Sequence, residues 1–201
     1  MARLFAKIDQ EIRKNGVWED GTWKGGTWES GIWRGGTWED GDWYSGTWIS
    51  GTWKGGTWFD GIWNGGIWKG GDWWDGTWEN GTWQGGTWQT GTWQGGTWKG
   101  GNWWAGTWFD GIWENGTWWA GIWSSGIWKL GTWLSGTWKG GTWFDGIWNG
   151  GTWENGTWKG GTWKGGNWWG GTWLGGTWYG GYDINDNYHE MGDSPDKWKL
   201  K

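Results

Sequence analysis

Few residues in this chain could do chemistry, and the densest group lies near its end. Asp183, Asn185 and Asn187 stand at alternate positions, as do the first ligands of a calcium-binding loop. The match then breaks, because Tyr188 stands where such a loop needs glycine and Ser194 where it needs glutamate. We therefore expect a solvated capping loop here and no metal site.

The rest of the chain offers few residues that could act in catalysis. His189 is the only histidine, and no nucleophile motif or metal partner lies near it, so we expect it at the surface. The chain has no cysteine, which excludes disulfides and cysteine-based zinc sites. Because an enzyme needs paired groups in a dry pocket, we expect no enzyme and no cofactor.

Aromatic stacking is the third kind of chemistry that the sequence offers. Large apolar residues recur at a spacing of fifteen, interrupted by Gln89. They are Tyr44, Phe59, Trp74, Trp104, Trp119 and Leu134. On a three-sided coil of fifteen residues they would form one ladder, and on a four-sided coil they would scatter over all sides. We take them as a candidate surface for a glycan, for a protein or for self-association.

These residues are positioned by a five-residue word, Gly-Thr-Trp-x-x, which runs 33 times from Gly16 to Gly180. Glycine holds the first place and tryptophan the third in every copy. A strict short period indicates a repeat architecture. So many exposed indoles would make the surface sticky, so the third-place tryptophans must form the core. Burying one tryptophan side chain removes roughly 200 Å² of its surface from water. This stabilises the fold by on the order of 5 kcal/mol before the loss of conformational entropy is subtracted.

The period of five requires one bend per word. Strand side chains alternate with period two, and a glycine at every fifth residue would break a helix. The junction between the fifth and first places is typically Gly-Gly, Asp-Gly, Asn-Gly or Ser-Gly, which are turn dipeptides. Two folds fit: a parallel β-solenoid with one word per side, and an antiparallel meander of very short hairpins. The string from Trp78 to Trp83 resembles tryptophan-zipper hairpins, and Trp-x-x-Gly resembles the turn of MORN repeats.

A parity argument favours the solenoid. A regular meander would need two turn types in alternation, and hence a ten-residue word. The stretch from Gly51 to Gly66 is instead repeated identically from Gly136 to Gly151, an offset of 17 words. Because 17 is not a multiple of two, three or four, all sides of the coil should be equivalent. We expect glycine and tryptophan to point inward, the second and fourth places outward, and the fifth place to form the corner.

In this register the word resembles the pentapeptide-repeat family, whose word runs small, polar, Leu or Phe, polar, turn. The resemblance covers Gly16 to Gly180 and departs at the centre, with Trp for Leu and Gly for Ala. It implies a right-handed, four-sided β-helix. Some members of that family mimic DNA and bind topoisomerases, which makes DNA mimicry an alternative function.

The charge argues against nucleic-acid partners and against DNA mimicry. The net charge is −5 with mixed signs, whereas DNA as long as an eight-layer rod carries about 23 charges. No stretch is long enough to span a membrane, and the start lacks the apolar run of a signal peptide. We therefore expect synthesis in the cytoplasm, no membrane contact and no nucleic acid.

Three segments are predicted: a capping helix at 1–15, the repeat at 16–180 and a polar cap or tail at 181–201. The helix rests on Leu4, Phe5, Ile8 and Ile12 at helical spacing, between Ala2 and Asn15. The predicted protein is a rigid, non-enzymatic structural solenoid. Such rods are common in viral fibres, so by analogy we expect a fibre or particle component, associated with a virion. The alternative is a binding module that uses the outward aromatic residues.

Overall fold

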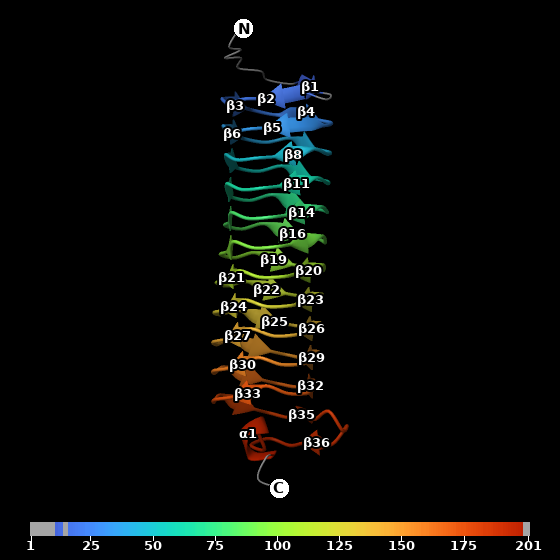
Figure 1. Ribbon diagram of the computed structural model, residues 1–201, viewed down its shortest axis with the longest axis vertical. Coiled ribbons are helices and arrows are strands. Elements are labelled where there is room, and N and C mark those ends of the chain that lie inside the picture. The colour runs from blue at the N-terminus through green and yellow to red at the C-terminus, as the bar shows by residue number, and fades with distance from the viewer. Residues whose placement is uncertain (1–10, 14–15, 199–201) are drawn as a thin grey trace.

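The computed structural model describes residues 11–13 and 16–198, and in it the repeat coils into a parallel β-solenoid of 11 turns (Figure 1). Each word forms one side of the coil, and three words make a turn of fifteen residues. The strands therefore stack into three parallel sheets, which we call A, B and C. The predicted β-solenoid is confirmed, and the alternative of an antiparallel meander is not.

Each sheet receives every third strand, and most strands cover only the second and third places of the word. Sheet A contains β3 (Thr22–Trp23), β6 (Thr37–Trp38), β9 (Thr52–Trp53), β12 (Ile67–Trp68), β15 (Thr82–Trp83), β18 (Thr97–Trp98), β21 (Ile112–Trp113), β24 (Ile127–Trp128), β27 (Thr142–Trp143), β30 (Thr157–Trp158) and β33 (Thr172–Trp173). Sheet B contains β1 (Glu11–Arg13), β4 (Gly26–Trp28), β7 (Asp42–Trp43), β10 (Thr57–Trp58), β13 (Asp72–Trp73), β16 (Thr87–Trp88), β19 (Asn102–Trp103), β22 (Thr117–Trp118), β25 (Thr132–Trp133), β28 (Ile147–Trp148), β31 (Thr162–Trp163) and β34 (Thr177–Trp178). Sheet C contains β2 (Gly16–Trp18), β5 (Gly31–Trp33), β8 (Thr47–Trp48), β11 (Ile62–Trp63), β14 (Thr77–Trp78), β17 (Thr92–Trp93), β20 (Thr107–Trp108), β23 (Ile122–Trp123), β26 (Thr137–Trp138), β29 (Thr152–Trp153), β32 (Asn167–Trp168), β35 (Gly181–Tyr182) and β36 (Tyr188–His189).

Two backbone hydrogen bonds per word join each turn to the one before it. The second-place amide of Thr52 donates to the carbonyl oxygen of Gly36 at 2.9 Å, and the fourth-place amide of Lys54 donates to that of Trp38 at 2.8 Å. The same pair of bonds recurs along the repeat. The register is strict, with Trp38 opposite Trp53, so equal places of the word lie directly above one another.

The first-place glycine makes the bend. Gly101 has a φ of +111°, a conformation that only glycine adopts readily, and the corresponding glycines along the repeat share it. A Cβ atom on Gly101 would also overlap the carbonyl oxygen of Gly86 in the preceding turn. Backbone conformation and close stacking therefore both require glycine at this place.

The acidic and amide residues at the fifth place stabilise the corner that follows them. The Oδ1 atom of Asp60 accepts a hydrogen bond from the amide of Gly61 at 2.7 Å, and Asn80 does the same for Gly81. This satisfies the amide of the residue that adopts the positive φ. The preference for Asp and Asn at the fifth place thus has a local cause.

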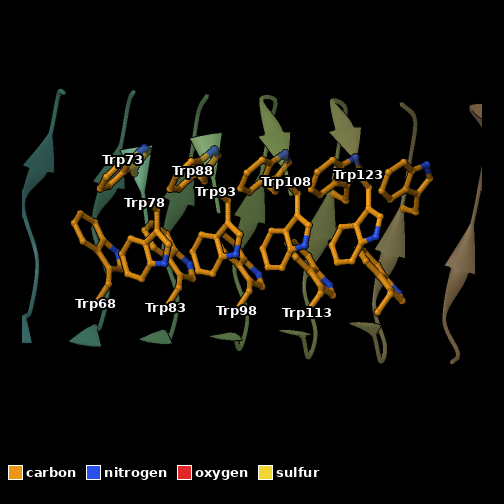
Figure 2. Close-up of a cluster of buried hydrophobic side chains, with 14 of the residues drawn as sticks. Trp68, Trp73, Trp78, Trp83, Trp88, Trp93, Trp98, Trp108, Trp113 and Trp123 are labelled. Carbon is orange, nitrogen blue, oxygen red and sulfur yellow. The ribbon is translucent and has the colours of Figure 1, made fainter. Parts of the chain in front are cut away.

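The core consists of the third-place tryptophans, stacked in three columns (Figure 2). Indoles on the same sheet lie nearly parallel, as in Trp88 and Trp103, whose ring centroids are 4.7 Å apart. Consecutive indoles along the chain meet edge to face, as in Trp103 and Trp108 at 6.0 Å and 73°. Both arrangements are favoured by the aromatic quadrupole. Apart from Trp18, Trp168, Trp173 and Trp178 near the ends, these tryptophans are fully buried.

The coil has three sides, whereas the family resemblance implied four. Each indole already meets its chain neighbours edge to face, as Trp98, Trp103 and Trp108 do, so three rings close one layer. A fourth side would widen the interior beyond what these rings fill, and protein interiors are close-packed. The size and shape of the indole therefore account for the smaller coil.

The expected equivalence of the sides is visible in the repeated stretch. Its first copy begins at Gly51 and supplies β9, β10 and β11 on sheets A, B and C. Its second copy begins at Gly136 and supplies β26, β27 and β28 on sheets C, A and B. The same residues thus adopt the same conformation on different sides.

The helix predicted between Ala2 and Asn15 is wrong where it can be checked. Glu11–Arg13 forms β1, which pairs in parallel with β4 and places Glu11 opposite Gly26 and Arg13 opposite Trp28. The rest of the predicted helix lies outside the described residues. The edge of β4 offers unpaired backbone groups, and pairing with that edge outweighs the local helical pattern.

The other end of the solenoid is covered by residues 181–198. Strand β35 extends sheet C, β36 folds back antiparallel to it, and the helix α1 (Pro195–Trp198) follows. Trp198 lies edge-on to Trp178, the last indole of the sheet B column, with ring centroids 5.4 Å apart. The cap therefore continues the aromatic packing of the core.

Candidate functional site

The six outward residues predicted to form a candidate surface lie on one face. Each occupies the fourth place of a word of sheet B, directly after the strand, and successive strands β7, β10 and β13 are in register. Because one turn contains fifteen residues, the spacing of fifteen becomes a ladder along the rod. We call Tyr44, Phe59, Trp74, Gln89, Trp104, Trp119 and Leu134 the aromatic ladder.

Within the ladder the rings stack along the solenoid axis. Tyr44 and Phe59 are 4.7 Å apart between centroids, and Trp74 follows Phe59 at 6.3 Å. Trp104 and Trp119 are 4.6 Å apart and nearly parallel, at 6°. The faces of stacked rings cover one another, so the ladder presents mainly ring edges to its surroundings.

The ladder is an accessible surface. The exposed fraction is 50% for Trp74 and 42% for both Trp104 and Trp119, whereas the indoles of the core are buried. Phe59 and Leu134 are half-buried. Exposed aromatic residues gathered on one face are typical of interaction surfaces.

Sheet A carries a second ladder, which the sequence reasoning missed. Its fourth places hold the exposed lysines Lys54, Lys69, Lys99, Lys129 and Lys159. Two of them form ion pairs with the preceding turn, Lys54 with Glu39 at 3.2 Å and Lys129 with Glu114 at 3.3 Å. The same spacing of fifteen would have revealed this face once the coil was known to have three sides.

Lys159 makes a cation–π contact with an aromatic side chain of the preceding turn. Its Nζ atom lies over the ring of Phe144, one turn earlier on sheet A, at 4.1 Å from the centroid. The ring face attracts a cation because its quadrupole is negative there.

The loop at the C-terminal cap is a hydrogen-bonded cluster. The Oδ1 atom of Asp183 accepts hydrogen bonds from the amides of Asn185 at 2.8 Å and Asn187 at 2.9 Å. The side-chain amide of Asn187 also donates to this carboxylate. The alternating residues that resemble a calcium loop therefore bind one another. In the part of the chain that the structure describes, no group of three or more His, Cys, Asp or Glu residues is placed to hold a metal ion.

His189 is not at the surface, contrary to the expectation from sequence. Its side chain is only 15% exposed, and its ring stacks on that of Trp198 at 3.9 Å. Nδ1 lies 2.9 Å from Asp193 and Nε2 lies 3.3 Å from Asp183. The imidazole thus ties the loop and α1 together over the end of the core.

The hydrogen bonds lower the pKa of Asp183 to about 2, from an ordinary value of 3.8. The largest cause is the hydrogen bond from the side chain of Asn187, and burial, the next largest, opposes it by raising the pKa. The backbone amide of Asn187, the side chain of His189 and the backbone amide of Asn185 lower the pKa further. All of these donors favour the ionised carboxylate. The carboxylate is therefore a charged structural element of the cap.

Comparisons with known proteins do not assign the chain to a family. No protein-family profile matches the chain, and no curated protein does. One solved structure that aligns with it is a candidate acetyltransferase from Desulfovibrio desulfuricans G20, at 4% identity and a TM-score of 0.17. That alignment covers 75% of this chain and 63% of the other, and so low a score supports no argument about fold or function.

Among the described residues, no helix has the length and apolar character needed to cross a bilayer. The surface features described above are the aromatic ladder, the lysine ladder and the cap.

Proposed function

We propose that this protein is a rigid, non-enzymatic structural rod that contacts its partner through the aromatic ladder. The observation that carries the proposal is the row of exposed, mutually stacked rings on sheet B, fixed to a core of indoles. Rigid placement lowers the conformational entropy lost on binding, which favours recognition by an extended surface. In word and register the rod would be a three-sided counterpart of the pentapeptide-repeat solenoids, and its shape suits a component of a fibre or particle.

Two features favour a structural role over the alternatives. A glycan platform needs open ring faces, whereas stacking covers most faces of Tyr44, Phe59, Trp104 and Trp119. Eleven turns at about 4.8 Å make a rod of roughly 50 Å, and DNA of that length carries about 30 phosphate charges. The net charge of −5 falls far short of DNA mimicry, and sheet A is rich in lysine.

The test is to change Trp74, Trp104 and Trp119 together to threonine. The fourth place holds Lys, Glu, Asn and Gln in other words, so the variant should keep the circular dichroism and melting behaviour of the parent chain. Aromatic contacts are insensitive to screening by salt, so the parent chain should keep its partners at high salt. The variant lacks three of the rings and should lose these partners.

A matched control carries the same three threonines at fourth places of sheet C, replacing Glu79, Gln94 and Ser124. It should capture the same partners as the parent chain. If both variants lose binding equally, or if neither does, the aromatic ladder is not the contact surface.

A further inference from the structure

The lysine ladder of sheet A and the aromatic ladder of sheet B share one order of rungs over four turns. On sheet A, the fourth places of these turns hold Lys54, Lys69, Gln84 and Lys99. On sheet B, one word later in each turn, they hold Phe59, Trp74, Gln89 and Trp104. Each lysine therefore corresponds to a ring, and the one glutamine corresponds to a glutamine.

The two ladders also have the same spacing along the rod. Strands β9, β12, β15 and β18 are in register on sheet A, as are β10, β13, β16 and β19 on sheet B. Sheet A of one copy can therefore lie on sheet B of a second copy, rung opposite rung, when both rods run in the same direction. The match ends on either side, where Glu39 would face Tyr44 and Lys159 would face Lys164.

The two faces differ in charge. The words of sheet A contain six lysines and four acidic residues, whereas those of sheet B contain five acidic residues and one lysine. Three exposed carboxylates of sheet B accompany the first rings of the match, with Asp60 beside Phe59 and with Asp72 and Asp75 in the word of Trp74. Faces of opposite charge favour contact with each other over contact between like faces.

The lysine opposite Trp74 in this match is Lys69, which is exposed. Within the residues that the structure describes, no carboxylate forms an ion pair with Lys69, whereas Lys54 is paired with Glu39. The ammonium group of Lys69 is therefore available to the carboxylates beside Trp74 on a second copy.

The outward rings suit the stems of the lysines. The aromatic ladder presents mainly ring edges, and the exposed fractions of Trp74 and Trp104 are 50% and 42%. A lysine side chain packs its methylene groups on apolar surface and keeps its charged end accessible. Much of the contact is therefore apolar, and screening by salt weakens only the ion pairs.

One face of the rod is large enough for a stable interface. The rod is roughly 50 Å long, and a word of five residues spans at most about 16 Å. Two such faces in contact bury up to about 1,600 Å² in total, the size of a standard protein–protein interface.

We propose that a second copy of this chain covers the aromatic ladder with the lysine ladder of its own sheet A, the two rods lying parallel. The inference rests on the proposed function, since it names the partner of the same ladder. Because the two faces differ, the contact is heterologous. Each copy in a pair keeps one face unused, so association continues beyond two copies.

The experiment measures self-association of the full chain by sedimentation velocity over a range of concentrations. The parent chain should form assemblies larger than a dimer. Lys69→Glu combined with Lys99→Glu should weaken this association at least tenfold, because it places carboxylates opposite the rings and carboxylates of sheet B. The fold should be retained, since Glu39 and Glu114 occupy the same place on sheet A.

A matched control makes the same change of charge on sheet C, with Arg34→Glu and Lys139→Glu. Both residues are exposed at fourth places, and Arg34 contributes only an exposed ion pair with Glu19. The control should associate like the parent chain. Equal weakening by the control and by the sheet A variant would overturn the proposal, because the effect would then come from net charge.

Mixing two deficient variants tests the pairing of unlike faces. The sheet A variant keeps its aromatic ladder, and the triple threonine variant of Trp74, Trp104 and Trp119 keeps its lysine ladder. Each alone should stay monomeric, and an equal mixture should form a one-to-one pair that grows no further. A carbodiimide, which joins lysine to carboxylate, should link Lys69 of the threonine variant to Asp72 or Asp75 of the other variant.

Four results would overturn the proposal. They are a sheet A variant that associates as tightly as the parent chain, a mixture that stays monomeric, crosslinks from Lys129 in place of Lys69, and a parent chain that stays monomeric. The second-copy proposal then fails by itself. Loss of captured partners by the triple threonine variant would still support the aromatic ladder as a contact surface for another molecule.

Discussion

Replacing Trp103 with alanine tests whether the stacked indoles are the source of stability. Trp103 is fully buried, stacks on Trp88 and Trp118 at 4.7 Å each, and meets Trp98 and Trp108 edge to face. The change removes roughly 140 Å³ of side chain, and at 24 cal/mol per Å³ an unrelaxed cavity costs about 3 kcal/mol. The lost transfer free energy and four aromatic contacts raise the expected loss to about 5 kcal/mol.

The assay is denaturant unfolding followed by far-ultraviolet circular dichroism, so that the signal does not depend on the deleted indole. Gln94→Ala serves as the control, because Gln94 is exposed at a fourth place of sheet C and should cost less than about 0.5 kcal/mol. Because each turn contacts only its neighbours, the defect should also lower the cooperativity of unfolding. A free energy of unfolding for Trp103→Ala within 1 kcal/mol of that for Gln94→Ala would refute the account of the core.

Three further predictions concern the corner, the cap and the word. Gly101→Ala should cost roughly 3 kcal/mol or more in chemical unfolding, because it combines a positive φ with overlap on the preceding turn, whereas the adjacent Gly100→Ala should cost under about 1 kcal/mol. Asn187→Ala should raise the pKa of Asp183 from about 2 toward 3.8, as measured by carboxyl NMR titration. Deleting the word 101–105 should leave a folded solenoid by circular dichroism, since the sides are equivalent.

The pH dependence of the cap follows from the sign of the Asp183 shift. The folded pKa lies below the unfolded value, so the stabilisation is complete above about pH 4 and is lost as the pH falls toward 2. The parent cap should therefore loosen over this interval, and the Asn187→Ala cap should be less sensitive to it. An acid transition that is unchanged in Asn187→Ala would contradict the assignment of the pH dependence to Asp183. For the corner, equal stabilities of Gly100→Ala and Gly101→Ala would contradict the requirement for glycine at the first place of the word.

The sequence was sufficient for the solenoid because one short pattern specifies its core and corners in every word. Tryptophan at the third place could only be core, and glycine at the first place could only be a bend. The number of sides could not be read in this way, since it depends on how indoles such as Trp98, Trp103 and Trp108 meet in three dimensions. The ladder was therefore predicted as a set of residues, and its single face followed only from the three-sided coil.

The ends of the described chain were predicted less well, because they depend on contacts with the last turns. Glu11–Arg13 forms a strand through pairing with β4, and no local pattern indicates that partner. His189 is covered by Trp198 and held by two carboxylates, one of which follows it by four residues. Isolated residues in a polar segment carry no periodic signal, so their burial could not be inferred from spacing.

The equivalence of the three sides has a consequence for how such a chain changes by duplication. The repeated stretch puts Lys54 on sheet A and its duplicate Lys139 on sheet C, while Phe59 on sheet B corresponds to Phe144 on sheet A. A duplication whose length is not a whole number of turns therefore rotates the copied surface by a third of a circle and leaves the core chemistry untouched. Copying alone, without any point substitution, can redistribute charges and rings among the faces of this rod.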